Sequence, residues 1–82
     1  MKKFEEAQQR VKQLAKRPDN ATLLELYALF KQGKEGDVSG SRPSRLKLKE
    51  RAKYDAWAAK QGMSQDDARD AYCALVVKLE GK

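Results

Sequence analysis

The sequence predicts an all-α fold of four helices, and three observations support this. Apolar residues recur at steps of three and four in successive segments, which is the spacing of one helix face. Proline, glycine, aspartate and asparagine separate those segments. The chain has 82 residues, enough for one domain with one modest core, so we expect a single domain over residues 1–82.

The first expected helix occupies the N-terminal segment. Its apolar stripe consists of Phe4, Ala7, Val11 and Leu14. The run Arg17-Pro18-Asp19-Asn20 ends it, because proline disfavours a helical conformation in the residue before it, whereas Asp or Asn caps a following helix. We therefore expect a second helix to start near Asn20.

The second expected helix has an apolar surface wide enough to pack on more than one neighbour. That surface comprises Leu23, Leu24, Leu26, Tyr27, Leu29 and Phe30. The helix is expected to end at Gly33 or Gly36. Residues 36–46 are then rich in turn formers and lack helical periodicity, which predicts a long ordered loop. Such a loop is uncommon in so small a domain unless it serves a function, so it indicates a binding site nearby.

The third helix is expected over Leu48 to Gln61, ended by Gly62. Three alanines at helical spacing predict a face that allows close approach of another helix: Ala52, Ala56 and Ala59. Ser64 followed three residues later by Asp67 resembles a capping box, which predicts the start of a fourth helix. The periodicity there is the clearest in the chain and runs through Ala68, Ala71, Tyr72, Leu75, Val76 and Leu79.

The composition excludes several classes of site. One cysteine, Cys73, permits no intramolecular disulfide, and the absence of histidine removes the usual Cys/His zinc sites and the commonest general base. No Gly-x-Ser-x-Gly elbow or glycine-rich phosphate loop occurs. We therefore expect no catalytic residue and no metal, with Cys73 as a packing residue. A mechanism that uses carboxylates alone is the catalytic alternative that the composition leaves open. Neither a membrane-spanning apolar run nor a secretory signal is evident, which predicts a soluble, intracellular protein.

The charge indicates the kind of partner without choosing it. A formal net charge of +6 favours nucleic acid, acidic membrane surfaces or phosphorylated small molecules. On the second helix Tyr27, Lys31 and Lys34 project within about 60° of one another, at 100° per residue. On the third, Lys49, Lys53 and Lys60 share a face with Trp57 at its margin. Exposed lysines are usually solvated and aromatics usually belong to the core, which is the reading we favour for Trp57.

In their order and spacing, these residues resemble the acyl-CoA-binding protein family from Phe4 to about Leu79. The matching pieces are Phe4-x-x-Ala7, Pro18, Leu24-x-x-Tyr27-x-x-Phe30-Lys31-Gln32, Gly36-Asp37, Arg42-Pro43, Lys49-x-x-Ala52-Lys53-Tyr54-Asp55-Ala56-Trp57, Gly62-Met63-Ser64 and Ala68-x-x-Ala71-Tyr72. The resemblance implies an up-down-down-up bundle of four helices that binds long-chain acyl-CoA esters without transforming them. The CoA head group would lie in a bowl-like face and the acyl chain in an apolar groove.

The same resemblance implies the roles of individual residues. Tyr27, Lys31 and Lys53 match contacts to the region of the adenosine 3′-phosphate, and Phe30 matches an aromatic residue on adenine. Tyr72 matches a contact near the pantetheine and thioester. Two further positions often line the CoA site, Lys12 and Lys49. Phe30 replaces the tyrosine typical of the family, which keeps stacking but loses a hydroxyl contact worth about 0.5–1.5 kcal/mol.

The expected protein is thus a cytoplasmic monomer without a cofactor, whose ligand is acyl-CoA and whose further partners are transient contacts with acyl-CoA-using enzymes or membranes. Two alternatives remain at this stage. The net charge would suit a helical nucleic-acid-binding domain, whose affinity falls steeply with salt. An enzyme acting on acyl-CoA, such as a thioesterase, would share the ligand resemblance but release free thiol.

Overall fold

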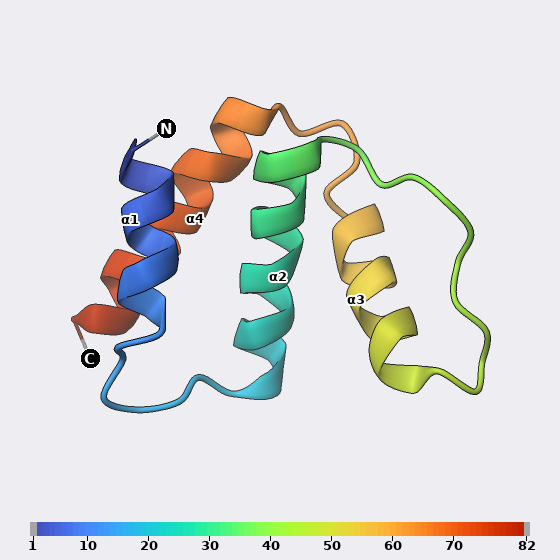
Figure 1. Cartoon of the computed structure of the whole chain (residues 1–82), viewed down its shortest axis with the longest axis horizontal. Helices are drawn as coiled ribbons and strands as arrows, with labels where there is room; N and C mark the ends of the chain where they lie inside the picture. The colour runs from blue at the N-terminus through green and yellow to red at the C-terminus, as the bar shows by residue number, and fades with distance from the viewer. Residues whose placement is uncertain (1, 82) are drawn as a thin grey trace.

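The computed structural model describes residues 2–81, which form four helices arranged as Figure 1 shows. Their bounds are α1 (Lys2–Val11), α2 (Asn20–Glu35), α3 (Leu48–Ala58) and α4 (Gln65–Glu80). In Figure 1, α1 runs downward, α2 and α3 run upward, and α4 runs downward again, so the expected up-down-down-up order is confirmed. α2 packs against both α4 and α3, while α1 packs against α4.

The starts of α2 and α4 follow from their capping residues. The Asp19 carboxylate accepts a hydrogen bond from the Thr22 N–H at 2.8 Å, and the Ser64 hydroxyl accepts one from the Asp67 N–H at 3.0 Å. Each side chain thereby satisfies a backbone donor that has no partner inside its helix. Both predicted starts are confirmed. α2 ends at Glu35 and is capped by Gly36, one of the two predicted stops, whose φ of 84° suits glycine.

Two predicted helix ends lie too far along the chain. α1 ends at Val11, so Leu14 lies beyond the helix whose stripe it was expected to extend. α3 ends at Ala58, three residues before Gln61. There the Gln61 N–H donates to the carbonyl three residues earlier, at 3.1 Å, because the chain tightens into turns before Gly62, which has a φ of 94°.

The predicted small-residue face of α3 is wrong at one position. Ala52 and Ala56 are half-buried, but Ala59 is exposed. Ala59 follows the last residue of the helix, where the chain has already turned. It therefore adds nothing to a helix contact.

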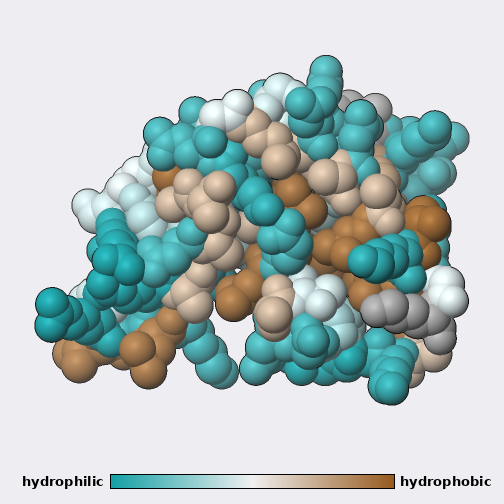
Figure 2. Space-filling model, turned by 180° about the vertical axis from the view of Figure 1, so that it is seen from behind, coloured by the Kyte–Doolittle hydropathy of each residue, from teal (hydrophilic) through white to brown (hydrophobic). Residues whose placement is uncertain are grey.

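The core lies among α1, α2 and α4. It is formed by the buried side chains of Phe4, Ala7, Leu26, Leu29, Tyr72 and Val76. The Phe4 ring meets Tyr72 edge-on with centroids 5.3 Å apart and stacks with Phe30 at 6.1 Å, so one aromatic cluster joins the three helices. The periodicity predicted for α4 is confirmed, since its stripe is buried or half-buried. Hydrophilic residues cover much of the face shown in Figure 2.

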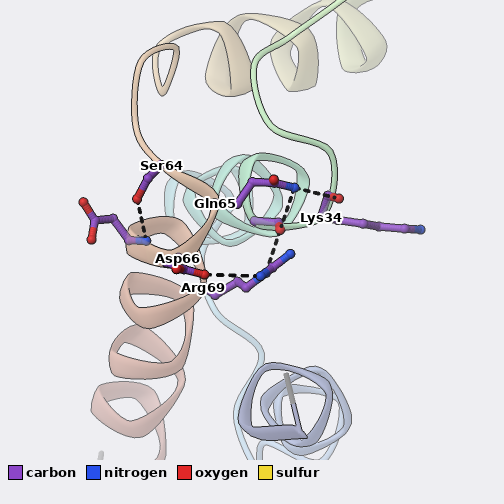
Figure 3. Close-up of polar contacts among 7 residues, drawn as sticks. Lys34, Ser64, Gln65, Asp66 and Arg69 are labelled. Atoms are coloured by element: carbon purple, nitrogen blue, oxygen red, sulfur yellow. Dashed lines mark hydrogen bonds and ion pairs between the residues drawn. The ribbon is translucent and has the colours of Figure 1, made fainter.

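The end of α2 is fastened to the start of α4 by side chains of α4, as Figure 3 shows. Arg69 Nε donates to the carbonyl of Gly33 at 2.8 Å, and Gln65 Nε2 donates to that of Lys34 at 3.2 Å. The last carbonyls of a helix have no partner within it. α4 thus supplies the partners that α2 lacks.

The loop after α2 contacts α3 at three points, Gly36, Gly40 and Arg42. In Figure 1 it runs beside α3 on the outer side of the molecule. The Trp57 indole N–H donates to the carbonyl of Gly36 at 2.8 Å, and the Tyr54 hydroxyl donates to that of Gly40 at 3.1 Å. Arg42 forms a two-pronged ion pair with Asp55, at 2.8 and 2.7 Å.

Asp37 joins this loop to the α3–α4 turn. Its carboxylate accepts hydrogen bonds from Gln32 Nε2 at 2.8 Å and from the Gly62 N–H at 2.9 Å. Gln32 is fully buried and also donates to the carbonyl of Met63, at 2.8 Å. Gln32 therefore links α2 to both connecting segments.

Among the helices of residues 2–81, none is long and apolar enough to cross a bilayer.

Replacing Gly33 with alanine is expected to destabilise the protein. An added Cβ would lie 2.9 Å from Cγ of Arg69 and 3.1 Å from Cζ of Phe4, so packed side chains must move. Overpacking costs about 1–3 kcal/mol, which offsets or exceeds the roughly 1 kcal/mol that alanine gains in helix propensity. We expect a net loss of about 1 kcal/mol in urea unfolding. Gly81→Ala is the control, since its Cβ would meet atoms only at 3.6 Å or beyond. A Gly33→Ala variant as stable as the parent would contradict this packing.

The Asp37 contacts predict a dependence of stability on pH. Its pKa is lowered, first by the hydrogen bond from the Gly62 N–H and then by that from Gln32. Because the folded carboxylate binds protons less readily than the unfolded one, its stabilisation is present above about pH 4 and is lost as pH falls through the lower folded pKa. Unfolding in urea is expected to show Asp37→Asn less stable than the parent at about pH 7 and less stable by a smaller margin at about pH 3, where the stabilisation has begun to fall. An equal difference at both values would exclude this role.

Candidate ligand-binding groove

A groove of about 500 Å³ opens between the first half of α2 and the start of α3. It is lined by Arg17, Asn20, Leu23, Leu24, Tyr27, Leu48, Lys49, Ala52 and Lys53. Apolar residues of both helices therefore line the groove together with three cationic side chains. None of the described residues lining the groove is acidic.

The apolar part of the groove comes from both helices. Leu23 and Leu24 project from the first turns of α2 and are half-buried. Leu48 and Ala52 stand one turn apart on α3, so they occupy the same face of that helix. These side chains provide a surface on which an alkyl chain can replace water.

The cationic part lies beside them on α3. Lys49 and Lys53 are one turn apart and exposed, and no described acidic residue forms an ion pair with either. Like charges at this spacing cost about 0.2–0.5 kcal/mol, which an anion between them would reverse. The Lys53 ammonium lies 5.4 Å from the centroid of the Tyr27 ring, so a cation–π contact links α3 to α2.

We call the line of cation–aromatic contacts between α2 and α3 the seam. It continues at Lys31, one turn further along α2 than Tyr27. Its ammonium lies 4.8 Å from the centroid of the Trp57 ring and pairs with Glu35. Trp57 is 7% exposed, so its predicted place in the core is confirmed. Lys53 of α3 thus faces Tyr27 of α2, and Lys31 of α2 faces Trp57 of α3. Four of the residues expected from the sequence meet along this seam: Tyr27, Lys31, Lys49 and Lys53.

Phe30 and Tyr72 lie outside the groove lining, in the aromatic cluster with Phe4. Tyr72 is only 4% exposed, and this burial raises the pKa of its hydroxyl. Phe30 is half-buried, and the Lys34 ammonium lies 5.5 Å from its ring centroid. The structure therefore places these two aromatics on the α4 side of α2, while Tyr27 stands on the α3 side.

Lys12 is also outside the groove lining, because it stands exposed in the turn that follows α1. Arg17, further along the same connection, does line the groove. The path of the segment between α1 and α2 therefore decides which of these two cations reaches the groove.

Several lining residues were not expected as site residues. Leu48 and Ala52 are the clearest cases, and a signal for them exists in the sequence. Their spacing of four repeats that of Lys49 and Lys53 one residue later, so an apolar strip and a basic strip run side by side on one helix. Asn20 carried no such signal beyond its place at a helix start.

A second hollow, of about 780 Å³, is larger but chemically different. It is lined by Lys2, Lys3, Phe4, Asp66, Arg69, Asp70 and Cys73. Charges of both signs meet there, and it contains none of the predicted site residues. Cys73 is half-buried, and burial raises the pKa of its thiol, which makes the reactive thiolate scarcer. Among residues 2–81, no group of three or more His, Cys, Asp or Glu side chains could hold a metal ion.

The groove between α2 and α3 thus has the chemistry of a site for an amphiphilic anion. Its leucines can accept an apolar chain, and its lysines can accept charged oxygens through charge-assisted hydrogen bonds. A planar ring can stack on the aromatic side chains along the seam. A ligand with these three parts would use every kind of surface that the groove offers.

Comparison with known proteins agrees with this chemistry. Residues 1–76 match the family described as Acyl CoA binding protein. The chain is 46% identical over 82 residues to the acyl-CoA-binding protein of Dictyostelium discoideum, covering all of this chain and 98% of that protein. It is 48% identical over 79 residues to acyl-CoA-binding protein homolog 1 of Caenorhabditis elegans, covering 96% and 92% of the two chains.

The fold agrees as well. The crystal structure of acyl-CoA-binding protein 2 from Oryza sativa superposes with a TM-score of 0.91 at 38% identity, covering 95% of this chain and 87% of that one. Sequence, helix order and groove chemistry lead to one conclusion: the chain belongs to the acyl-CoA-binding protein family.

Proposed function

We propose that this chain binds medium- to long-chain fatty acyl-CoA esters without covalent change and carries or buffers them in the cell. The observation that carries the proposal is the groove between α2 and α3, which combines a leucine-rich wall with a cationic rim and has no acidic residue among its described lining. Membership of a family of binding proteins also confirms the prediction that the chain is not an enzyme.

The groove suggests how the ligand divides between its walls. The acyl chain lies against Leu23, Leu24 and Leu48, because burial of each methylene contributes about 0.8 kcal/mol. The 3′-phosphate lies at Lys53, with Lys49 at the rim. Tyr27 is already in contact with the Lys53 ammonium and holds it beside the groove.

Lys31 extends the proposed phosphate site along the seam. Its ammonium pairs with Glu35, so a phosphate that binds Lys31 exchanges one anionic partner for another. The cost is small, because ion pairs this exposed contribute about 0–1 kcal/mol. Lys31 is thereby positioned by Glu35 and Trp57 until the ligand arrives.

Three further contacts remain predictions, and each requires the bound ligand to extend beyond the groove. Phe30 is proposed to stack on adenine, Tyr72 to lie near the pantetheine, and Lys12 to add charge at the edge of the CoA site. None of the three lines the groove, so the CoA moiety must extend from the seam toward the side of α2 that faces α4.

The proposed setting follows the family resemblance. We propose a cytoplasmic monomer in which residues 1–82 form one acyl-CoA-binding domain, needing neither cofactor nor metal. Transient contact with acyl-CoA-using enzymes or membranes would load and unload it. We propose no nucleic-acid partner, because the cations at the groove stand beside leucines.

Affinity is expected to rise with acyl-chain length. Isothermal titration with palmitoyl-CoA, octanoyl-CoA and free CoA should give one-to-one binding that tightens in the order free CoA, octanoyl, palmitoyl. Each buried methylene adds up to about 0.8 kcal/mol, less the cost of ordering the chain. Equal affinity for all three ligands, with the protein folded by circular dichroism, would overturn the proposed groove. Release of free thiol would contradict the binding role.

Lys53→Gln is expected to weaken palmitoyl-CoA binding by about tenfold or more, since hydrogen bonds to charged groups contribute about 1.5–3 kcal/mol. Titration with 3′-dephospho-palmitoyl-CoA makes the test specific, because the substitution should then cost much less. Lys78→Gln, an exposed lysine of α4, is the matched control. An equal loss with both ligands would show that Lys53 does not contact the 3′-phosphate.

A further inference from the structure

The most exposed large apolar side chains among the described residues include two leucines where the loop enters α3. Leu46 is 94% exposed and Leu48 is 74% exposed. Figure 2 shows hydrophobic surface projecting at the lower left, at the end of the molecule where α3 begins. Leucines this exposed leave most of their apolar surface in water, which favours a partner for the pair.

Basic residues alternate with these leucines. The segment reads Arg45-Leu46-Lys47-Leu48-Lys49, and every residue in it is exposed. No ion pair among the described residues involves Arg45, Lys47 or Lys49. We define residues 45–49 as the basic tip. It combines projecting apolar side chains with cations that have no anionic partner in the described structure.

We propose that the basic tip is a docking surface for anionic phospholipid bilayers. Leucines enter the interface between headgroups and acyl chains, while basic residues remain at the anionic headgroups. Each basic residue close to such a surface strengthens partitioning about fivefold. The proposal assigns a surface to the transient membrane contact proposed above, but it can be tested without acyl-CoA.

Two other occupants fit the basic tip less well. A second copy of the chain would bring its three cations against three of its own kind, and like charges repel. Nucleic acid would pair with the cations, but its phosphate backbone offers no apolar surface to Leu46 and Leu48. A lipid surface satisfies both halves of the pattern.

The basic tip also adjoins the ligand groove. Leu48 and Lys49 belong to both, since they line the groove and are exposed. Docking would therefore bring the mouth of the groove to the bilayer surface. An acyl chain could then pass between the bilayer and the leucines without crossing bulk water.

The test uses the full chain without ligand, in sedimentation with phosphatidylcholine vesicles that contain or lack phosphatidylserine. The parent should bind the phosphatidylserine vesicles and bind phosphatidylcholine alone weakly. Leu46→Gln should lower binding about tenfold, and Arg45→Gln/Lys47→Gln about twenty-fivefold, because the first loses apolar insertion and the second loses two cations. Leu46 does not line the groove, so Leu46→Gln should bind palmitoyl-CoA like the parent.

Two controls are matched to these variants. Val77→Gln removes another exposed apolar side chain, 56% exposed on α4, and should leave vesicle binding unchanged. Lys3→Gln/Lys78→Gln lowers the net charge by the same two units and should reduce binding much less than the change in the basic tip. Three outcomes would each overturn the proposal. The two charge variants could lose vesicle binding equally, or the parent could fail to bind phosphatidylserine vesicles. The parent could also bind duplex DNA, with an affinity that Leu46→Gln does not change, while it binds no vesicles.

Discussion

The packing of α2 on two neighbours is the constraint on which the structure depends. One side of α2 meets α4 and closes the core, where Leu26 and Leu29 are buried. The other side meets α3, which packs on no other helix among the described residues. A helix packed on two sides needs a wide apolar surface, and α2 has one, because Leu26, Ala28 and Leu29 are buried and Leu23, Leu24, Tyr27 and Phe30 are half-buried. The groove lies along this second contact, between α2 and the start of α3.

Polar contacts add to the packing of α3 on α2, its one helix neighbour among the described residues. The Trp57 indole, the Arg42–Asp55 pair and the Asp37 carboxylate tie α3 and its flanking turns to the loop after α2. Exposed ion pairs contribute little singly, but these contacts act on one segment and restrict it together. This accounts for a loop of this length in so small a protein, because the loop fixes α3, and α3 forms one side of the groove.

The distribution of charge is more informative than its sum. Where basic residues stand away from the groove, several are paired, as Lys60 is with Glu25 and Arg10 with Glu80. At the groove, Lys49 and Lys53 form no ion pair with described residues. A net charge of +6 suits many anionic partners. Cations beside a leucine wall suit an anion with an apolar tail, and the same juxtaposition recurs at the basic tip.

The sequence by itself determined the presence of four helices, the capping residues of α2 and α4, and the family. Spacing, prolines, glycines and capping side chains are local signals, and the structure follows them at Asn20, Gly36 and Ser64. Only the tertiary structure decided which candidates share a groove. Periodicity fixes the face on which a side chain lies but not which neighbour covers that face. Tyr27 and Phe30, about 60° apart on α2, therefore looked alike, although Tyr27 meets Lys53 of α3 and Phe30 meets Tyr72 of α4. Leu48 lines the groove for the same reason: the position of α3 against α2, which no local pattern encodes, brings it there.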